Sequence, residues 1–245
     1  MALLHSPRII TNGLVLCLDA GNSKSYPRSG TAWNDLSGIG NNGTLTNSPT
    51  FNSENLGNIQ FVSASLQHIQ LTTTNTATYD FANTTFTVSA WFRLTTLPVT
   101  NGFHYVISKG ASATAGGWGL QILETGRFQV VTKTTGGANT CIRLSTTALS
   151  TNLWYNITAI LTTSTTTIAT NNVTMYLNGQ LETGTLSQLS TYSGDTTTPI
   201  QLARRGGTAA GYMNGNIANA QIYNRALSAS EVLNNYNATR SRFGV

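Results

Sequence analysis

Acidic side chains, on which most hydrolytic chemistry depends, are few and widely spaced in this chain of 245 residues. The eight acids are Asp19, Asp35, Glu54, Asp80, Glu124, Glu182, Asp195 and Glu231. Hydrolysis of a glycosidic bond needs two carboxyl groups held about 5–9 Å apart. On one face of a strand such a pair would be about two or four residues apart, and no two acids here have that spacing. We therefore expect no enzymatic activity, and a glycoside hydrolase would need distant acids to converge.

Metal binding is also poorly supported by the residues that could serve as ligands. The three histidines are His5, His68 and His104, and they lack the spacing of a helical zinc site. The polar stretch from Leu18 to Leu45 contains Asp19 and Asp35, which are the alternative calcium ligands. These two carboxylates cannot neutralise a calcium ion alone, and the alternating acids of a calcium loop are absent. We expect no metal and no cofactor, and we expect Asp35 to cap a turn by bonding its own backbone two residues on.

Sugar binding needs only aromatic faces with amide or hydroxyl groups, so the tryptophans are candidates. Trp91 and Trp154 fall on the polar phase of two strand-like segments, whereas Trp118 shares its phase with apolar neighbours and is expected in the core. Two such indoles on neighbouring strands would form a platform for stacking a sugar. Alternatively, they fill a second, smaller core, because a buried indole needs only one acceptor for its N–H.

A second candidate for carbohydrate contact is the group Arg204, Arg205 and Tyr212, which flanks the loop GGTAAG. Loops between strands lie at the rim of a sheet, where binding residues are frequently found. The alternative interpretation is that these are solvated loop side chains.

The composition excludes several partners. Charged residues make up 9% of the chain, against about 25% in ordinary proteins, and the net charge of +5 comes from scarce acids. A concentrated basic stripe is missing, so we expect no nucleic-acid partner. The start MALLHSPRIITNG lacks the apolar core of a signal peptide, and no segment has the length of a membrane span. We expect a soluble protein, made in a cytoplasm, with no membrane partner.

Segments with strand character recur from about residue 13 to residue 225. FTVSAWFRL (86–94) and LWYNITAIL (153–161) alternate between apolar and polar positions. Asn178-Gly179 predicts a hairpin, and Ser228 and Glu231 have the spacing of a capping box that opens a helix over about 229–238. The sequence predicts an all-β protein, one antiparallel β-sandwich domain over 1–245 with one short C-terminal helix.

The chain ends and the two cysteines complete these expectations. We expect a mobile N-terminal arm over about 1–12 and a mobile tail over about 239–245, each free to dock on a neighbouring molecule. Cys17 and Cys141 both fall in strand-like runs. Buried free thiols are the simpler interpretation, and a disulfide across the sandwich is the alternative.

The segments GLVLCLDA, SYPRSGTAWNDLSGIGNNGTL, FTVSAWFRL, VTMYLNGQL and NGNIANAQIYNRALSASEVLNNYNAT occur in this order along nearly the whole chain. This order resembles the laminin-G-like, concanavalin A-like lectin/glucanase superfamily, and more narrowly the LamG-type proteins of tailed bacteriophages. The resemblance implies a jelly-roll sandwich with its first and last strands close together. The paired acids of the family's hydrolases are absent, and so is the acidic Asp-Gly segment that related sequences often carry where this chain has 61–71.

The resemblance implies a non-enzymatic virion protein of a tailed bacteriophage, either a capsid decoration protein or a fibre or spike adhesin that can bind a host-surface glycan. Such a protein would assemble in the host cytoplasm with other virion proteins and be a homo-oligomer, with a trimer favoured. The alternative function is a carbohydrate-binding lectin module.

Overall fold

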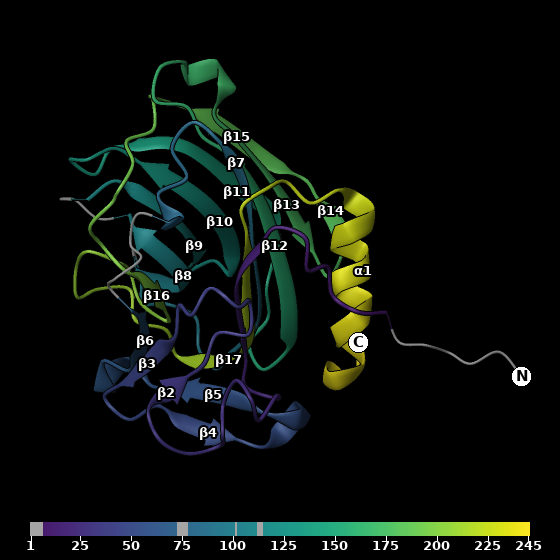
Figure 1. The fold of residues 1–245 in the computed structure, drawn as a ribbon. Coiled ribbons are helices and arrows are strands. Elements are labelled where there is room, and N and C mark those ends of the chain that lie inside the picture. The colour runs from purple at the N-terminus through teal and green to yellow at the C-terminus, as the bar shows by residue number, and fades with distance from the viewer. Residues whose placement is uncertain (1–6, 73–77, 101, 112–114) are drawn as a thin grey trace, which may run out of the picture.

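Two antiparallel β-sheets stacked face to face form the body of the protein (Figure 1). The structure is a computed structural model that describes residues 7–72, 78–100, 102–111 and 115–245. One helix lies outside the sandwich, near the C-terminus (Figure 1). The expected all-β antiparallel sandwich with a short C-terminal helix is therefore confirmed.

The first sheet, sheet A, is built around two long central strands, β7 (Thr85–Leu94) and β17 (Gly215–Tyr223), which pair with each other. Its order within the described residues is β14 (Gln180–Glu182), β13 (Asn172–Leu177), β12 (Trp154–Thr162), β7, β17, β5 (Asn58–Phe61) and β4 (Thr50–Asn52). A further strand, β1 (Leu14–Asp19), pairs with the second half of β17. Asn178 and Gly179 form the turn between β13 and β14, as the sequence predicts.

The second sheet, sheet B, lies against sheet A. Its order within the described residues is β15 (Gly184–Gln188), β11 (Asn139–Ala148), β10 (Arg127–Lys133), β9 (Gly117–Leu123), β8 (Phe103–Gly110), β16 (Ile200–Leu202), β6 (His68–Leu71), β3 (Gly43–Thr46) and β2 (Ala32–Trp33). Short 3-10 helices connect some strands: η1 (Glu54–Leu56), η2 (Ser63–Ser65) and η4 (Ile168–Thr170).

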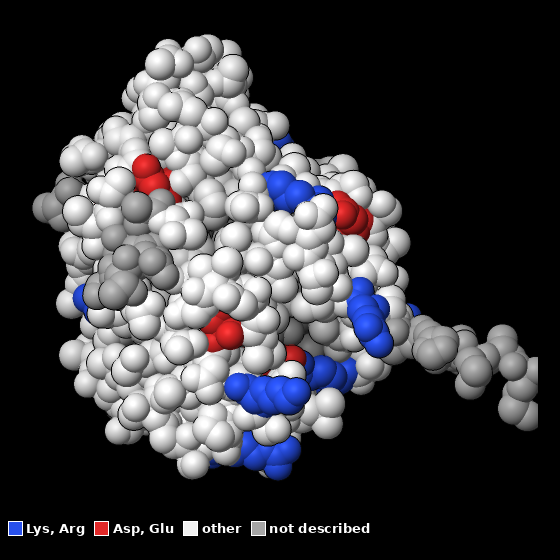
Figure 2. All heavy atoms as spheres, viewed as in Figure 1, with Lys and Arg blue, Asp and Glu red and all other residues white. Residues whose placement is uncertain are grey.

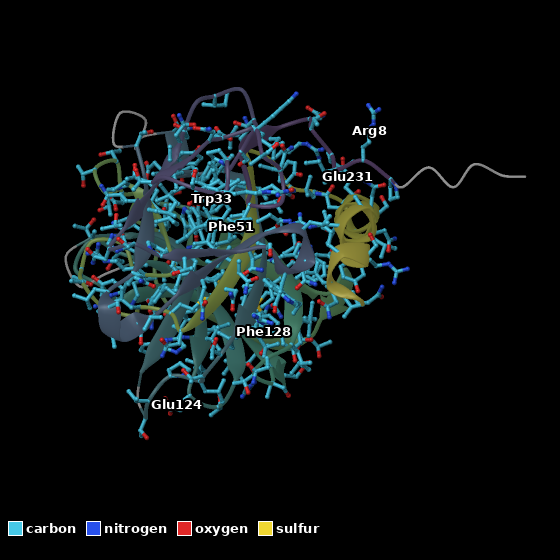
Figure 3. The ribbon with its side chains drawn as sticks, turned by 90° about the horizontal axis from the view of Figure 1, so that it is seen from below. Arg8, Trp33, Phe51, Glu124, Phe128 and Glu231 are labelled. Atoms are coloured by element: carbon cyan, nitrogen blue, oxygen red, sulfur yellow. The ribbon has the colours of Figure 1, made fainter. Side chains whose placement is uncertain are left out.

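The main core fills the space between the two sheets. The apolar phase of β7 points into it, as the alternation predicts: Phe86, Val88, Ala90, Phe92 and Leu94. Each large side chain buried in this way contributes about 1.5–3 kcal/mol. Trp118 lies in the same core. Trp33 is also fully buried there, next to Tyr26, and it anchors the long polar loop to the sandwich (Figure 3).

Helix α1 (Ala229–Thr239) covers the outer face of sheet A. Its start is the predicted capping box: the Ser228 hydroxyl accepts from the Glu231 amide, and the Glu231 carboxylate accepts from the Ser228 amide. This reciprocal pair satisfies two amides that would otherwise lack a partner. Val232 packs with Tyr176 and Tyr223 on the outer face of the sheet.

The C-terminal tail, expected to be mobile from about residue 239, contacts the body of the protein. The chain continues past α1 into η5 (Arg240–Phe243). Phe243 is buried against the sheet, and the Arg242 guanidinium pairs with the Asp19 carboxylate at 2.8 Å. The tail docks because the Phe243 ring fills an apolar position beside Trp91 and Trp154, and because Arg242 supplies a cation to the Asp19 carboxylate.

The end of the N-terminal arm is also docked. Ile10 donates to the Asn235 side chain at 2.8 Å, and its carbonyl accepts from the Tyr223 hydroxyl. The Arg8 carbonyl accepts from Asn234. The described end of the arm therefore contacts α1 and β17, its expected mobility stays a prediction, and residues 1–6 lie outside the described part of the chain.

Both cysteines are buried and free, so the disulfide alternative is not realised. Burial raises the pKa of Cys17 to about 12 and that of Cys141 to about 11. Such thiols remain protonated and unreactive at neutral pH. In the part of the chain that the structure describes, no helix has the length and apolar character to cross a membrane.

Candidate functional site

Trp91 and Trp154 lie together, as expected for neighbouring strands, but they are buried. β7 and β12 pair so that Trp91 is opposite Asn156 and Trp154 is opposite Arg93. The Phe243 ring stacks on Trp91 with centroids 4.1 Å apart and also packs against Trp154 at 4.8 Å. We call the group formed by Trp91, Trp154, Ala218, Phe243 and Tyr236 the indole cluster.

The indole cluster is closed to a sugar. Trp91 is 1% exposed and Trp154 is 7% exposed, and the Trp91 indole N–H donates to the Thr239 hydroxyl at 2.8 Å. The structure therefore corrects the assignment of Trp91 and Trp154 as carbohydrate-binding residues. They form the second, smaller core that was the alternative, because the C-terminal segment covers the faces that a sugar would need.

Asp19 and Asp35, the alternative metal ligands, are occupied by donors of the chain itself. One oxygen of Asp19 accepts from the Gly21 amide and from Arg242. Asp35 accepts from the amides of Ser37 and Cys17, and the Ser37 contact is the predicted turn, two residues on. No cluster of three or more potential metal-ligating side chains occurs among the described residues.

Two other acids, Asp80 and Asp195, do converge, although they are far apart in the sequence. The Asp80 carboxylate accepts from the backbone amide of Asp195. Burial raises the pKa of Asp195, but hydrogen bonds from Thr198 and Thr197 and the charge of the buried Lys109 outweigh it, so that the pKa is lowered. A glycosidase needs one carboxyl group with a raised pKa to act as general acid. The pKa of Asp195 is lowered instead, so this carboxyl group stays ionised beside the buried Lys109 and does not suit the role of a general acid.

Tyr212 leads to the open site of the molecule. It lines a cavity of about 560 Å³ together with the loop after β7, the first residues of β8, and the segment before β17. We call this cavity the Tyr212 pocket. Two apolar side chains in its wall are solvent-accessible: Phe103 is 38% exposed and Val99 is 82% exposed. The pocket thus offers aromatic and aliphatic surface that nothing in the described chain covers.

Polar groups stand beside that apolar surface. The Asn214 side chain accepts from the Ser63 amide and donates to the Thr96 hydroxyl, which fixes the three residues at the pocket wall. His104 is 7% exposed, and its ring nitrogens have no hydrogen-bond partner of good geometry among the described residues. Burial lowers the pKa of His104, and the nearby backbone of Tyr212 and Thr96 opposes this effect. His104 is therefore neutral at physiological pH, and its ring nitrogens are enclosed in the pocket wall.

Arg204 and Tyr212 come together as the sequence suggested, and His68 joins them. The Arg204 guanidinium carbon lies 5.5 Å from the Tyr212 ring centroid, and its Nη1 is 3.2 Å from His68 Nε2. The His68 and Tyr212 rings meet edge to face at 5.8 Å. Arg205 points elsewhere: its Nε–H donates to the Thr208 hydroxyl at 2.8 Å, and the side chain also bonds Tyr105.

His68, Phe103 and His104 complete the site and were not identified from the sequence as binding residues. His68 and Arg204 are 136 positions apart, and they meet because β6 and β16 are neighbours in sheet B. Phe103 and His104 begin β8, two residues before the strand that the sequence pattern indicates. The one sequence signal for Phe103 and His104 is that an aromatic residue is followed directly by a histidine.

Comparison with known proteins identifies the family and the fold of the chain. Residues 63–233 match the Laminin_G_3 family, described as the concanavalin A-like lectin/glucanases superfamily. No curated protein matches the chain.

Solved structures with the same fold include two binding domains and one further botulinum neurotoxin structure. The binding domain of Paraclostridial Mosquitocidal Protein 1 has a TM-score of 0.66 at 19% identity, covering 93% of this chain and 52% of that one. The binding domain of botulinum neurotoxin DC in complex with SialylT has a TM-score of 0.65 at 14% identity, covering 94% and 52%. A botulinum neurotoxin type C structure, titled for cell entry through two ganglioside molecules, has a TM-score of 0.67 at 13% identity, covering 94% and 52%. The chain thus spans about half the length of these structures.

Proposed function

Because the chain belongs to the concanavalin A-like lectin/glucanases superfamily, we propose that the protein is a non-enzymatic carbohydrate-binding module whose binding site is the Tyr212 pocket. The observation that carries the proposal is the combination of open aromatic surface with fixed hydrogen-bonding groups in one cavity. Ligand sites are typically concave and largely apolar, with a few well-placed polar groups.

The chemistry of the pocket suits a sugar. The C–H faces of a pyranose pack on aromatic rings such as those of Tyr212 and Phe103, and its hydroxyl groups need donors and acceptors such as the half-buried Asn214 amide. The pocket wall is fixed by internal hydrogen bonds, so little ordering would be needed on binding.

The similar toxin structures support carbohydrates as the class of ligand, without indicating which carbohydrate. One is a complex with SialylT, and another is titled for interaction with gangliosides. Their identity to this chain is low and they are about twice as long, so the glycan and the contact residues are argued from the pocket alone.

Glycan binding by the purified protein tests the proposal. We expect an oligosaccharide array to give reproducible ligands and calorimetry to give a dissociation constant for the strongest. Tyr212→Ala and Phe103→Ala should each weaken binding at least about tenfold, since each removes an aromatic contact worth about 1–2 kcal/mol.

Leu181→Ala is the matched control, because Leu181 is 63% exposed on β14, away from the Tyr212 pocket. Its affinity should be unchanged. An array without any ligand, or a Tyr212→Ala protein that binds as tightly as the unmodified chain, would refute the proposal.

The setting that we propose for this module is the surface of a tailed-bacteriophage virion, as a capsid decoration protein or a fibre or spike adhesin assembled in the host cytoplasm. The support is the resemblance of the segment SYPRSGTAWNDLSGIGNNGTL to the phage LamG-type proteins. Charged residues make up only 9% of the chain, and most of the face in Figure 2 is uncharged apart from several Lys or Arg side chains at its lower right, which suits association with little dependence on salt.

Mass spectrometry of purified particles tests this setting. Hundreds of copies per particle would indicate decoration and a handful would indicate a fibre, whereas absence from the particle would refute it. Light scattering of the purified protein tests the proposed trimer. A polysaccharide digestion screen tests the hydrolase alternative, for which we expect no released sugar.

A further inference from the structure

We propose that the Tyr212 pocket selects acidic glycans, with Arg204 pairing with the carboxylate of a uronic or sialic acid. This inference rests on the proposed function, because it names the class of sugar that the same site would take. It is carried by the unusual situation of Arg204 among the arginines of the chain.

Four other arginines are neutralised or saturated by the protein itself, and what sets Arg204 apart from all the rest is an enclosed side-chain nitrogen without an acceptor among the described residues. Three of them, each within 4 Å of a carboxylate oxygen, are Arg93, Arg225 and Arg242. Arg143 has no carboxylate, but its guanidinium donates to the carbonyls of Val173 and Gly184 at 2.8 and 3.0 Å. These arginines are therefore explained by the contacts that they make within the fold.

Arg204 lacks such an explanation. No carboxylate in the described residues lies within ion-pair distance of its guanidinium. Its Nε–H is enclosed and has no acceptor in the described chain. A buried donor without an acceptor destabilises the folded state. A half-buried cation without a counterion is suited to an anion that comes from outside.

His68 holds this cation in place. The Leu66 carbonyl can only accept, so the His68 Nδ1 that lies 3.0 Å from it carries the proton. Nε2 then has a free lone pair, which accepts from Arg204 Nη1. Burial lowers the pKa of His68, as does the charge of Arg204, although the Leu66 hydrogen bond opposes both. A neutral imidazole therefore orients the guanidinium without cancelling its charge.

Tyr212 joins the cation to the pocket. Its ring lies beneath the guanidinium at 5.5 Å and is also part of the pocket wall. Arg204 does not itself line the pocket but contacts the Tyr212 ring, so a charged substituent of a sugar packed on Tyr212 would have to extend past that ring to reach the guanidinium. A planar guanidinium matches a carboxylate through two parallel hydrogen bonds, which favours a sugar acid over a neutral sugar.

Calorimetric titration with matched pairs of probes tests the inference: sialyllactose against lactose, and trigalacturonic acid against galactotriose, with sulfated lactose as a third anionic arm. We expect at least one of the two sugar acids to bind about tenfold or more tightly than its neutral counterpart. Arg204→Gln should abolish that preference. Arg205→Gln removes the same charge from the next position, where the side chain bonds Thr208, and should leave the preference intact.

The outcomes separate this inference from the proposed function. If neutral and acidic probes bind equally and Arg204→Gln changes nothing, the pocket binds glycans but the inference is wrong. If sulfated lactose alone binds, recognition of a carboxylate is wrong. If no probe binds and the wider glycan array is also empty, the proposed function itself has failed.

His68 is a positioning residue in this scheme, and its variants test that role separately from folding. His68→Phe keeps a ring against Tyr212 but removes the acceptor, so affinity for the acidic probe should fall while affinity for the neutral probe stays the same. His68→Gln restores an acceptor and should recover part of the preference. Equal losses for both probes in His68→Phe would show that His68 only supports the structure.

Discussion

The indole cluster and the Tyr212 pocket are both aromatic groups at the surface of the sandwich, yet they differ in what the chain itself supplies to them. In the indole cluster, Phe243 stacks on Trp91 and Thr239 accepts its N–H. In the Tyr212 pocket, Phe103 remains exposed and Arg204 lacks a counterion among the described acids. The difference teaches that a group of aromatic residues does not by itself identify a binding site. Exposed rings and charged groups without a partner in the chain are better indicators.

The largest expected effect is on stability, from Trp91→Ala in the indole cluster. Removal of a fully buried indole from the centre of β7 should lower the free energy of unfolding by about 3–5 kcal/mol, measured by urea denaturation. Trp91→Phe should lose less, because a ring remains against Phe243. A Trp91→Ala protein that folds normally but has lost glycan binding would reverse the comparison and restore the stacking platform.

A smaller effect is expected from Arg242→Met, which removes the cation that fixes the tail. The partly buried Asp19 carboxylate would lose its partner, and the carbonyls of Asn55 and Gly57 would each lose a donor. The free energy of unfolding should fall by about 1–3 kcal/mol, and limited proteolysis should remove the tail faster. Unchanged proteolysis would show that Phe243 alone holds the segment.

The start of α1 should respond to pH in a predictable direction. Hydrogen bonds from Arg225 and from the Ser228 amide lower the pKa of Glu231 to about 2. The contribution of this carboxylate is therefore fully present above the unfolded-state pKa of about 4.3 and is lost as the pH falls through 2.

Glu231→Gln should remove that pH dependence and cost about 0.5–1 kcal/mol at neutral pH, since the pair is partly exposed and screened by salt. Denaturation curves at a series of pH values check both points. A variant whose stability falls in acid as steeply as that of the unmodified chain would assign the effect to other carboxylates.

A small effect on stability is expected in the Tyr212 pocket. Tyr212→Ala should lower the free energy of unfolding by about 1 kcal/mol, because the half-buried ring loses its contacts with His68 and Arg204, while glycan affinity falls at least about tenfold. Thermal denaturation of the variant checks the first value. A large loss of stability would show that Tyr212, like Trp91, mainly supports the fold.

Much of the fold could be predicted because its signals are local. Alternation identified the long strands β7 and β12, Asn178-Gly179 identified the hairpin, and Ser228 with Glu231 identified the start of α1. The Asp35 turn also depends on neighbours in sequence. Each of these features is determined by physical chemistry within a few residues.

The docked tail and the composition of the site could not be predicted in this way. TRSRFGV is a polar segment with one aromatic ring, and it docks only because Asp19 and Trp91 present matching surfaces. Arg204 and Tyr212 were found because they flank one loop. His68 was not, because it reaches them through the pairing of β6 with β16.

The position of β17 has a consequence for how the chain reaches this structure. It is the last strand to be synthesised, yet it lies inside sheet A, where it pairs with β7, β5 and β1. Until it arrives, those three strands have unpaired edges that can associate with other chains. Pairing across such sequence separation also makes folding slow. The nascent chain should therefore complete its sandwich only after β17 has been synthesised, and its yield should depend on protection from aggregation during that interval.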